Sequence, residues 1–571
     1  MPYIKKTSHN VCKGSGRCAK LCFLPLIILF GCTALVFDLA NLGRGVKVQQ
    51  EQEMQHKLAG LNCDAYGGPS EEVAQELVYW EDIPSDATYV SPFKKRNEGP
   101  KQYLTFEPDG GGWNNVRMNM ETVLAMAYAM GRTLVLPPEQ EFYLLGARKG
   151  KNGDSQQRQF SFNDFFHMES IRNEHPGLDI ITMKEFLEQE AMAGNLRNQQ
   201  NGSVVFPPQN QTDWNGVGRR PRGPLWEFLR STTGHVAIWK PEECMAAFPT
   251  SPDPQATQRL WDIKQQVEQE HEGSFPMPSA YIGKPVPVNA SAKERMMENW
   301  SRRKTLCLYD NTLQNTQFIH FPSDYRLGAR LLVHFYAFLF FEDWQQDLHM
   351  KRFVRDHVRY VDRIQCAAAR VIEALRERAR NNPAVAGQNP KGEYDAFHIR
   401  RGDFQYKVTR VDARQIYEVS KSKLQEGQTI YIATEERDKK GFFQPLREKY
   451  DIVFLDDFRD VLGDDFNTNF DGMVDQLVAS RSRTFFGCWF SAFTAYINRL
   501  RGYHSTHERA PGYEEGIHNS WYYAPEDRYD QMQTYYPILN YNPGHAYIER
   551  EFPTSWRLID TGIGDLPAQV E

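Results

Sequence analysis

The sequence predicts an α/β protein with two parallel β-sheets and an N-terminal transmembrane helix. Two stretches, near residues 103–138 and 395–503, alternate buried strands with helical patterns, which is typical of parallel sheets. A third stretch, residues 21–37, is apolar and uncharged and follows a basic segment. The chain has 571 residues, more than one hydrophobic core usually supports, so we expect two or three domains.

The N-terminal segment has the pattern of a signal anchor. Lysines and arginines occur within residues 1–20, and the run LCFLPLIILFGCTALVF, residues 21–37, carries no charge before Asp38. As a helix this run is roughly 26 Å long, close to the thickness of the thinner bilayers. The basic residues before the run place residues 1–20 in the cytoplasm. We therefore predict a single-pass type II protein of the Golgi or endoplasmic reticulum membrane, anchored by residues 21–39, with a cleaved signal peptide as the alternative.

A stem is predicted after the anchor, and two other features agree with a lumenal body. Residues 40–96 are rich in Gln, Glu and Ser with little apolar periodicity, which predicts a stem. Acceptor sites for N-glycosylation occur at Asn201, Asn210, Asn289 and Asn299. Five cysteines follow the anchor, so at least one thiol stays unpaired, and the pairing is open: Cys63, Cys244, Cys307, Cys366 and Cys488.

The N-terminal domain, predicted over residues 97–345, starts with a strand, a glycine turn, a helix and a strand. QYLTFEP contains the first strand, GGGWNN the turn, VRMNMETVLAMAYAMG the helix, and RTLVLPP the second strand. Residues 150–222 and 250–305 are polar and are predicted as loops. ARLLVHFYAFLFFEDW is predicted as core, because it is too short and too charged at its ends for a second membrane span.

The C-terminal domain, predicted over residues 346–571, begins with a long amphipathic helix over residues 351–380. Strands are predicted at AFHIR, TIYIATE, DIVFLDD and RTFFGCWF, and helices at VDQLVASR and SAFTAYINRLRG. This alternation predicts a second parallel sheet. Ligands of such sheets bind beyond the carboxyl ends of the strands.

Charged side chains gather at one of these strand ends. The stretch DAFHIRRGDFQYK presents His398, Arg400, Arg401 and Asp403 within a few residues. Guanidinium groups bind phosphates through paired hydrogen bonds. Ser491 stands just before a predicted helix, and a helix N-terminus is a ready anion site. The net charge of -6 gives no general attraction for nucleic acid, so we expect a local site for the diphosphate of a nucleotide sugar.

The same segments resemble the GDP-fucose-dependent O-fucosyltransferases, the protein and plant types together, and more distantly the α1,6-fucosyltransferases. HIRRGDF is similar to the H-x-R segment of this family, FSAFTAYINRLRG to its S-S-F-T helix, and YIATEE to its Y-I-A-T-D strand. GGWNNVRMN and RTLVLPP are similar to its N-terminal segment. The four segments occur in the same order across residues 103–503.

The resemblance implies a GT-B architecture, in which two Rossmann-like domains face a cleft and the C-terminal one binds GDP-fucose. It implies inverting transfer of fucose to a hydroxyl of a protein or glycan acceptor in the secretory pathway. No cofactor is expected, since GDP-fucose is the donor substrate, and no metal. The chain also lacks the Asp-x-Asp pair that holds a divalent ion in the other large class of glycosyltransferases.

The resemblance also implies site residues, position by position. Arg400 is similar to the arginine that binds the β-phosphate and stabilises the departing GDP, and Asn114 to the asparagine of the glycine turn. These two are the predicted catalytic residues. The residues predicted to bind the donor are His398, Arg401, Asp403, Asp475, Ser491, Phe493 and Thr494.

Some positions depart from the family pattern. Gly111 stands where some relatives have a glutamate base, so the chain must dispense with a base or use Glu107 or Asp109. Ala492, Glu435 and Arg483 replace a serine and two aspartates of the family, and these replacements bear on the guanine contacts.

Alternatives stay open for the activity and for single residues. The chain could use another nucleotide-sugar donor, or be a lumenal sugar-binding relative without activity. Taken alone, His398 could be a core histidine, Arg401 a surface ion-pair partner, and Asp475 a plain charge at a helix N-terminus.

Overall fold

The computed structural model describes residues 60–95, 99–146, 158–218, 222–271, 286–300, 303–402, 404, 406–510, 519–523, 551 and 553–563. The chain divides into two compact units, Met1–Lys57 and Leu58–Glu571, and every described residue belongs to the second. The anchor predicted over residues 21–39 lies outside the described residues. Within the described part of the chain, no helix has the length and hydropathy needed to cross a bilayer.

A five-stranded parallel sheet forms the core of the N-terminal half. Its strands are β1 (Tyr103–Phe106), β2 (Thr133–Leu136), β3 (Ile180–Thr182), β4 (His235–Val236) and β7 (Phe318–Phe321), in the order β3-β2-β1-β7-β4. All four pairings are parallel. The strand order reverses between β1 and β7, so the crevice for a ligand is expected at the carboxyl ends of these two strands.

Helix α4 (Trp113–Ala129) connects β1 to β2 and is buried on nearly all sides. It packs against β2, against α11 (Phe335–Phe338) and α12 (Trp344–His357), and against α18 (Ala492–His507). Gly112 is its N-cap. The helix ends at Ala129, and Gly131, two residues later, has a φ of 64°, the left-handed geometry that glycine adopts without strain.

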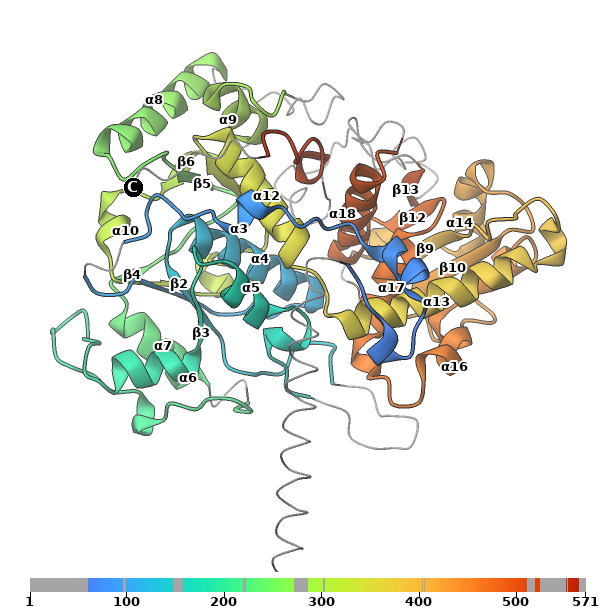
Figure 1. Cartoon of the computed structure of the whole chain (residues 1–571), viewed down its shortest axis with the longest axis horizontal. Helices are drawn as coiled ribbons and strands as arrows, with labels where there is room; N and C mark the ends of the chain where they lie inside the picture. The colour runs from blue at the N-terminus through green and yellow to red at the C-terminus, as the bar shows by residue number, and fades with distance from the viewer. Residues whose placement is uncertain are drawn as a thin grey trace, which may run out of the picture. The chain divides into compact units, whose positions relative to one another are not determined.

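A second five-stranded parallel sheet forms the C-terminal half. Its strands are β9 (Asp395–Ile399), β10 (Thr429–Thr434), β11 (Asp451–Val453), β12 (Phe485–Cys488) and β13 (Ser520–Tyr523), in the order β11-β10-β9-β12-β13. Every pairing is parallel. The prediction of two parallel sheets in an α/β protein is therefore confirmed, and the predicted strands occur at the predicted places. Figure 1 shows β2 to β6 on the left and β9 to β13 on the right.

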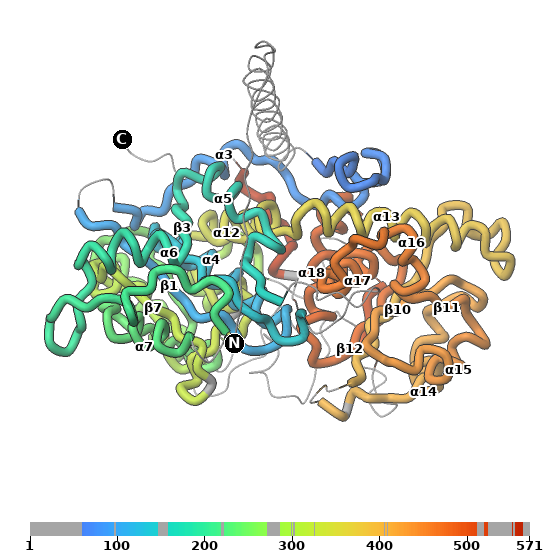
Figure 2. The backbone as a smooth tube through the Cα atoms, turned by 90° about the horizontal axis from the view of Figure 1, so that it is seen from below, coloured from blue at the N-terminus to red at the C-terminus, as the bar shows by residue number. Residues whose placement is uncertain are grey.

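Helices cover the second sheet. In Figure 2 α13 (Asp362–Arg380) runs past α16 (Arg459–Leu462) and α17 (Asp471–Ser480). α13 packs against α17, and α17 packs against α18. Other α-helices of the described residues are α2 (Glu71–Ala74), α3 (Pro84–Ala87), α5 (Met168–Glu174), α6 (Met183–Phe186), α7 (Gly223–Thr232), α10 (Asn311–Asn315), α14 (Ala413–Ser420) and α15 (Gln444–Arg447).

A third, three-stranded parallel sheet is formed by strands from the middle of the chain. It has the order β6-β5-β8, with β5 (Cys244–Phe248), β6 (Thr305–Leu308) and β8 (Leu339–Phe341). A disulfide joins Cys244 to Cys307 across β5 and β6. The prediction of loops is wrong where regular elements form, namely α5, β3 and α6 within 150–222, and α8 (Pro254–His271) and α9 (Ala292–Trp300) within 250–305. The apolar stretch around α11 and β8 is core, as predicted.

Residues 60–95 pack against the body, which differs from the predicted stem over 40–96. A disulfide joins Cys63 to Cys366 of α13, with 5.4 Å between the Cα atoms. Tyr79 and Trp80 are each 2% exposed, and the guanidinium of Arg359 lies 4.1 Å from the centre of the Trp80 ring. The elements here are only three or four residues long, so they leave no periodicity in the sequence. The other part of the predicted stem, residues 40–59, is outside the described residues.

The long helix predicted over residues 351–380 is two helices, α12 and α13, separated at residues 358–361. β-branched valines, which fit helices poorly, stand at both ends of this break. Tyr360 leaves the helical path and forms a β-bridge with Phe166. α12 starts at Trp344, so the domain boundary predicted between residues 345 and 346 falls inside this helix, which packs against α4 and β8 of the N-terminal half.

Candidate active site

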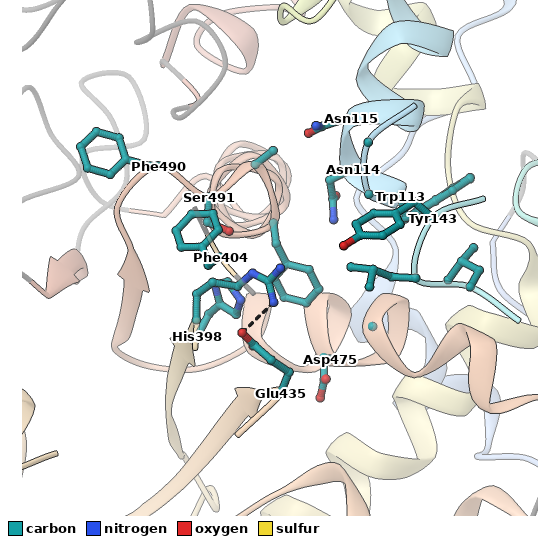
Figure 3. Close-up of a pocket in the computed structure, with 18 of the residues that line it drawn as sticks. Trp113, Asn114, Asn115, Tyr143, His398, Phe404, Glu435, Asp475, Phe490 and Ser491 are labelled. Atoms are coloured by element: carbon teal, nitrogen blue, oxygen red, sulfur yellow. Dashed lines mark ion pairs between the residues drawn. The ribbon is translucent and has the colours of Figure 1, made fainter. Parts of the chain in front are cut away.

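A cavity of about 1020 Å³ is lined by both halves of the body. Residues 110–115, which follow β1, and Ser323, which follows β7, line it from the N-terminal half. Arg400 follows β9, Glu435 follows β10, and residues 490–493 follow β12. The cavity thus lies where carboxyl ends of strands from both five-stranded sheets meet, at the reversal of strand order in each. Figure 3 shows this cavity.

Arg400 lines the cavity and is paired with an acid. Its Nη1 lies 2.6 Å from Oε1 of Glu435, the pair marked by the dashed line in Figure 3. The guanidinium also lies 5.2 Å from the centre of the Phe404 ring. The pair follows from the sheet, because Ile399 and Thr434 are in register on neighbouring strands and the next residue on each is Arg400 or Glu435. The Arg400 side chain is 21% exposed, and it reaches the cavity despite this pair.

His398 is held in one position by two neighbours. Its Nδ1 lies 2.7 Å from the Thr494 hydroxyl, and its ring stacks on Phe493 with 4.4 Å between the centroids. Burial, and then the charge of Arg400, lower the pKa of His398 to about 3, so the imidazole is neutral near pH 7. The Thr494 hydroxyl also accepts the backbone N–H of Cys488, so it joins β12 to His398 on β9.

The start of α18 forms a second wall of the cavity. Ser491 is the N-cap of this helix, but its side chain makes no capping hydrogen bond, and it lines the cavity (Figure 3). Phe490, just before it, has a φ of 63°, a left-handed geometry that is costly for a bulky residue and often marks ligand-binding turns. A methyl group on Gly487 would lie 2.1 Å from Cγ2 of Thr494. Glycine at 487 therefore lets Thr494 reach both Cys488 and His398.

Asn114 faces the cavity from the N-terminal half (Figure 3). Its Oδ1 accepts a hydrogen bond from Nε2 of Gln476 on α17, at 2.9 Å. Asp475, the neighbour of Gln476, also lines the cavity and accepts a 2.5 Å hydrogen bond from the Tyr431 hydroxyl. Asp475 was expected to open its helix, but α17 begins one turn earlier, at Asp471.

A buried chain of alternating charges holds α4 against α18. Arg117 contacts Glu121 at 2.5 Å, Glu121 contacts Arg499 at 2.8 Å, and Arg499 contacts Glu551. Burial favours the neutral acid at Glu121, but the charges of Arg117 and Arg499 outweigh it and lower the pKa of Glu121. Since α4 starts beside Asn114 and α18 beside Ser491, this chain fixes the two walls relative to each other.

One predicted residue that the structure describes, Arg401, points away from the cavity. Arg401 turns away, because its Nε contacts Glu436 at 3.2 Å and its guanidinium lies 4.3 Å from the Phe442 ring. It is not among the residues that line the cavity. Asp403 lies outside the described residues. The structure therefore brings together Arg400, Asn114, His398, Asp475, Ser491 and Phe493, with Thr494 behind His398.

The sequence profile of the GDP-fucose protein O-fucosyltransferase family matches residues 103–504. The chain belongs to this family. It is a glycosyltransferase, and its family transfers fucose from GDP-fucose.

Solved structures of fucosyltransferases are similar to the chain at low identity. POFUT1 in complex with GDP is 13% identical over 74% of this chain and 99% of that chain, with a TM-score of 0.31. POFUT1 in complex with GDP-fucose is 13% identical over 76% and 99%, with a TM-score of 0.29. Fucosyltransferase NodZ from Bradyrhizobium is 13% identical over 70% and 94%, with a TM-score of 0.29. No curated protein sequence matches the chain.

In this fucosyltransferase the two candidate bases are both paired with arginine. Glu107 receives two hydrogen bonds of 2.8 Å from Arg230 and one of 3.1 Å from His320. Burial would raise the pKa of Glu107, but His320 and Arg230 outweigh it and the pKa is lowered. Asp109 receives hydrogen bonds of 2.7 and 2.8 Å from Arg330. Neither acid is among the residues that line the cavity.

Sequence reasoning missed an apolar edge of the cavity. Tyr143 and Leu144 line it and are 53% and 51% exposed. A β-bridge ties Tyr143 to Gly112, and the N–H of Gly146 donates to Oδ1 of Asn469, at 2.6 Å. The segment therefore runs from the glycine turn of the fucosyltransferase to its C-terminal half. No sequence motif identifies this segment. Two adjacent large apolar residues in a loop after a proline-rich turn could have indicated an exposed binding surface.

Proposed function

We propose that the protein is an inverting fucosyltransferase that transfers fucose from GDP-fucose to a hydroxyl of a protein or glycan acceptor without a metal ion. We further propose that it acts in the lumen of the Golgi or endoplasmic reticulum, anchored by residues 21–39, and that its two halves have the GT-B arrangement. The observation that carries the activity is the convergence of Arg400, Ser491 and Asn114 on one cavity at the strand reversals of both sheets.

The C-terminal wall supplies the charges that a nucleotide diphosphate needs. Arg400 presents a guanidinium, and α18 is a helix of 16 residues whose N-terminus lines the cavity at Ser491. The peptide dipoles of such a helix attract an anion to its N-terminus. Both groups are in place before the reaction, so they can stabilise the charge that grows on the diphosphate as the bond to fucose breaks.

The neutral His398 suits a different task. Its pKa of about 3 keeps it uncharged, so it cannot supply a positive charge for the phosphates. Its stacking on the Phe493 ring, in a cavity that Asp475 also lines, supports a role in binding the guanosine part of the donor.

The two acids predicted as possible bases for the acceptor hydroxyl are poorly suited to that role. Glu107 and Asp109 are each engaged by an arginine, and the lowered pKa of Glu107 makes its carboxylate a weaker base. Asn114, on the opposite wall from Arg400, can orient the hydroxyl or the sugar by hydrogen bonds (Figure 3). The proposed mechanism therefore relies on departure of GDP and not on prior deprotonation of the acceptor.

A donor panel tests the proposal. The purified full chain is incubated with GDP-fucose, GDP-mannose, UDP-galactose or UDP-glucose, and both thermal stabilisation and release of the nucleotide diphosphate are measured. GDP-fucose at a hundredfold excess over its dissociation constant should raise the free energy of unfolding by about 2.7 kcal/mol. GDP release should persist after treatment with EDTA. Stabilisation by a UDP-sugar alone would refute the donor, and loss of release with EDTA would refute metal independence.

A further inference from the structure

The cationic side chains that line the cavity are paired with carboxylates before any donor binds. The lining residues that the structure describes include five cations, namely Lys240, Arg330, Arg400, Lys439 and Arg459. Each forms an ion pair with a carboxylate: Lys240 with Glu243, Arg330 with Asp109, Arg400 with Glu435, Lys439 with Asp456, and Arg459 with Asp471. Six carboxylates line the same space. A diphosphate that enters must therefore share or replace one of these carboxylates.

The carboxylate that pairs with Arg400 is itself held by the backbone and lines the cavity. Oε1 of Glu435 accepts two hydrogen bonds, one from Nη1 of Arg400 at 2.6 Å and one from the backbone N–H of Arg401 at 2.5 Å. The backbone bond keeps the carboxylate in place whether or not Arg400 stays on it. Gly402, with a φ of 48°, leaves room for Glu435, because a methyl group there would lie 3.1 Å from its Cγ.

We propose that Glu435 is a positioning residue that competes with the diphosphate for Arg400 and thereby sets the rate of GDP release. This inference rests on the proposed function. Before the donor binds, the carboxylate holds the guanidinium at the cavity wall. The arginine side chain is therefore already ordered when the donor arrives, and binding costs less conformational entropy. When the donor binds, its phosphate accepts hydrogen bonds from Arg400 in place of Glu435. The Glu435 carboxylate stays next to the phosphate, because the backbone N–H of Arg401 still holds it. Its negative charge then repels GDP after the fucose has left.

A purely structural ion pair would behave differently. It would contribute to the free energy of unfolding only, and its loss would leave the affinity for GDP unchanged or would weaken it by releasing Arg400. The competing carboxylate predicts the opposite sign, because removal of its charge makes the site more positive. The two interpretations are therefore separated by the direction of the change in GDP affinity.

The substitution Glu435→Gln removes the charge and keeps an oxygen that can accept both hydrogen bonds. The matched control is Glu436→Gln, the same change one residue later, at an acid that pairs with Arg401 and does not line the cavity. Glu435→Asp keeps the charge on a shorter side chain and serves as the conservative variant. Thermal unfolding of each full-length variant verifies that it folds.

Calorimetry and stopped-flow dissociation of GDP give the decisive readouts. Glu435→Gln should bind GDP about tenfold more tightly, and most of the change should be a slower dissociation. Its kcat and its KM for GDP-fucose should both fall. The affinity for GMP, which lacks the β-phosphate, should change by less than about twofold, as should the GDP affinity of Glu436→Gln and Glu435→Asp.

Three results would overturn the inference. GDP affinity of Glu435→Gln equal to or weaker than that of the original chain would identify a structural pair. An equal gain in Glu436→Gln would show a general effect of net charge. If neither the original chain nor any variant binds GDP, the proposed function itself fails and this inference fails with it.

Discussion

Replacement of Thr494 by valine should damage both the fold and the donor site, although the two side chains have the same shape. The hydroxyl of Thr494 accepts the N–H of Cys488 at 2.9 Å and bonds Nδ1 of His398 at 2.7 Å, and all three residues are buried. In Thr494→Val both partners lose their hydrogen bonds in a place that water does not reach. Each unsatisfied buried group costs about 1 to 3 kcal/mol, so the loss should be about 2 to 6 kcal/mol.

Thr232→Val is the matched control. Thr232 is 3% exposed, and its hydroxyl donates to carbonyls of its own helix, at Phe228 and Leu229. Those carbonyls can still accept hydrogen bonds from backbone N–H groups of the helix. The control should therefore lose less than about 1 kcal/mol of the free energy of unfolding. Urea unfolding of the full chain measures the stability of each variant, and calorimetry measures GDP affinity, which should fall only in Thr494→Val. If Thr494→Val loses no more stability than the control, the Thr494 hydroxyl does not stabilise the buried His398 and Cys488 groups as described.

Two further predictions concern other parts of the body. Burial lowers the pKa of His175 to about 4, whereas an unfolded histidine has a pKa of about 6.5. Between these values only the unfolded chain binds the proton, so the free energy of unfolding falls as the pH falls, by up to about 1.4 kcal/mol per pH unit. His175→Phe should flatten this dependence in urea unfolding between pH 7.5 and 5, and an unchanged slope would contradict it. Gly502→Ala should lower stability by about 1 to 3 kcal/mol, because the added methyl would lie 2.2 Å from the Trp556 ring, whereas Gly223→Ala, with open space around it, should not. Equal melting temperatures for these two variants would exclude the predicted clash.

The strands and the edge that carries the site could be predicted from the sequence because they are local. β9 and β12 are runs of four or five buried residues, and alternation with helices fixes a parallel sheet and hence the edge where ligands bind. Arg400 and Ser491 follow those strands directly. Their place at the cavity therefore needed no knowledge of distant contacts.

Other features depended on contacts that sequence patterns do not record. Two adjacent acids determine which arginine reaches the cavity. Glu435 pairs with Arg400 at the cavity, whereas Glu436 pairs with Arg401 away from it. The packing of residues 60–95 depends on a disulfide to a residue 303 positions away. Helix α8 could have been predicted, because Ala256, Leu260 and Val267 recur at helical spacing and are fully buried, but its many polar residues suggested a loop.

The central claim is that the guanidinium of Arg400 stabilises GDP as fucose departs. The most direct test compares GDP release from GDP-fucose by Arg400→Ala and Arg401→Ala, two adjacent arginines of which only the first lines the cavity. By analogy with the loss of one oxyanion contact, Arg400→Ala should raise the activation free energy by about 2.7 to 4 kcal/mol, so that kcat falls roughly 10²- to 10³-fold. Arg401→Ala should lose less than about tenfold, because it breaks a partly exposed ion pair. Similar losses in the two variants, or full release by Arg400→Ala, would contradict the claim.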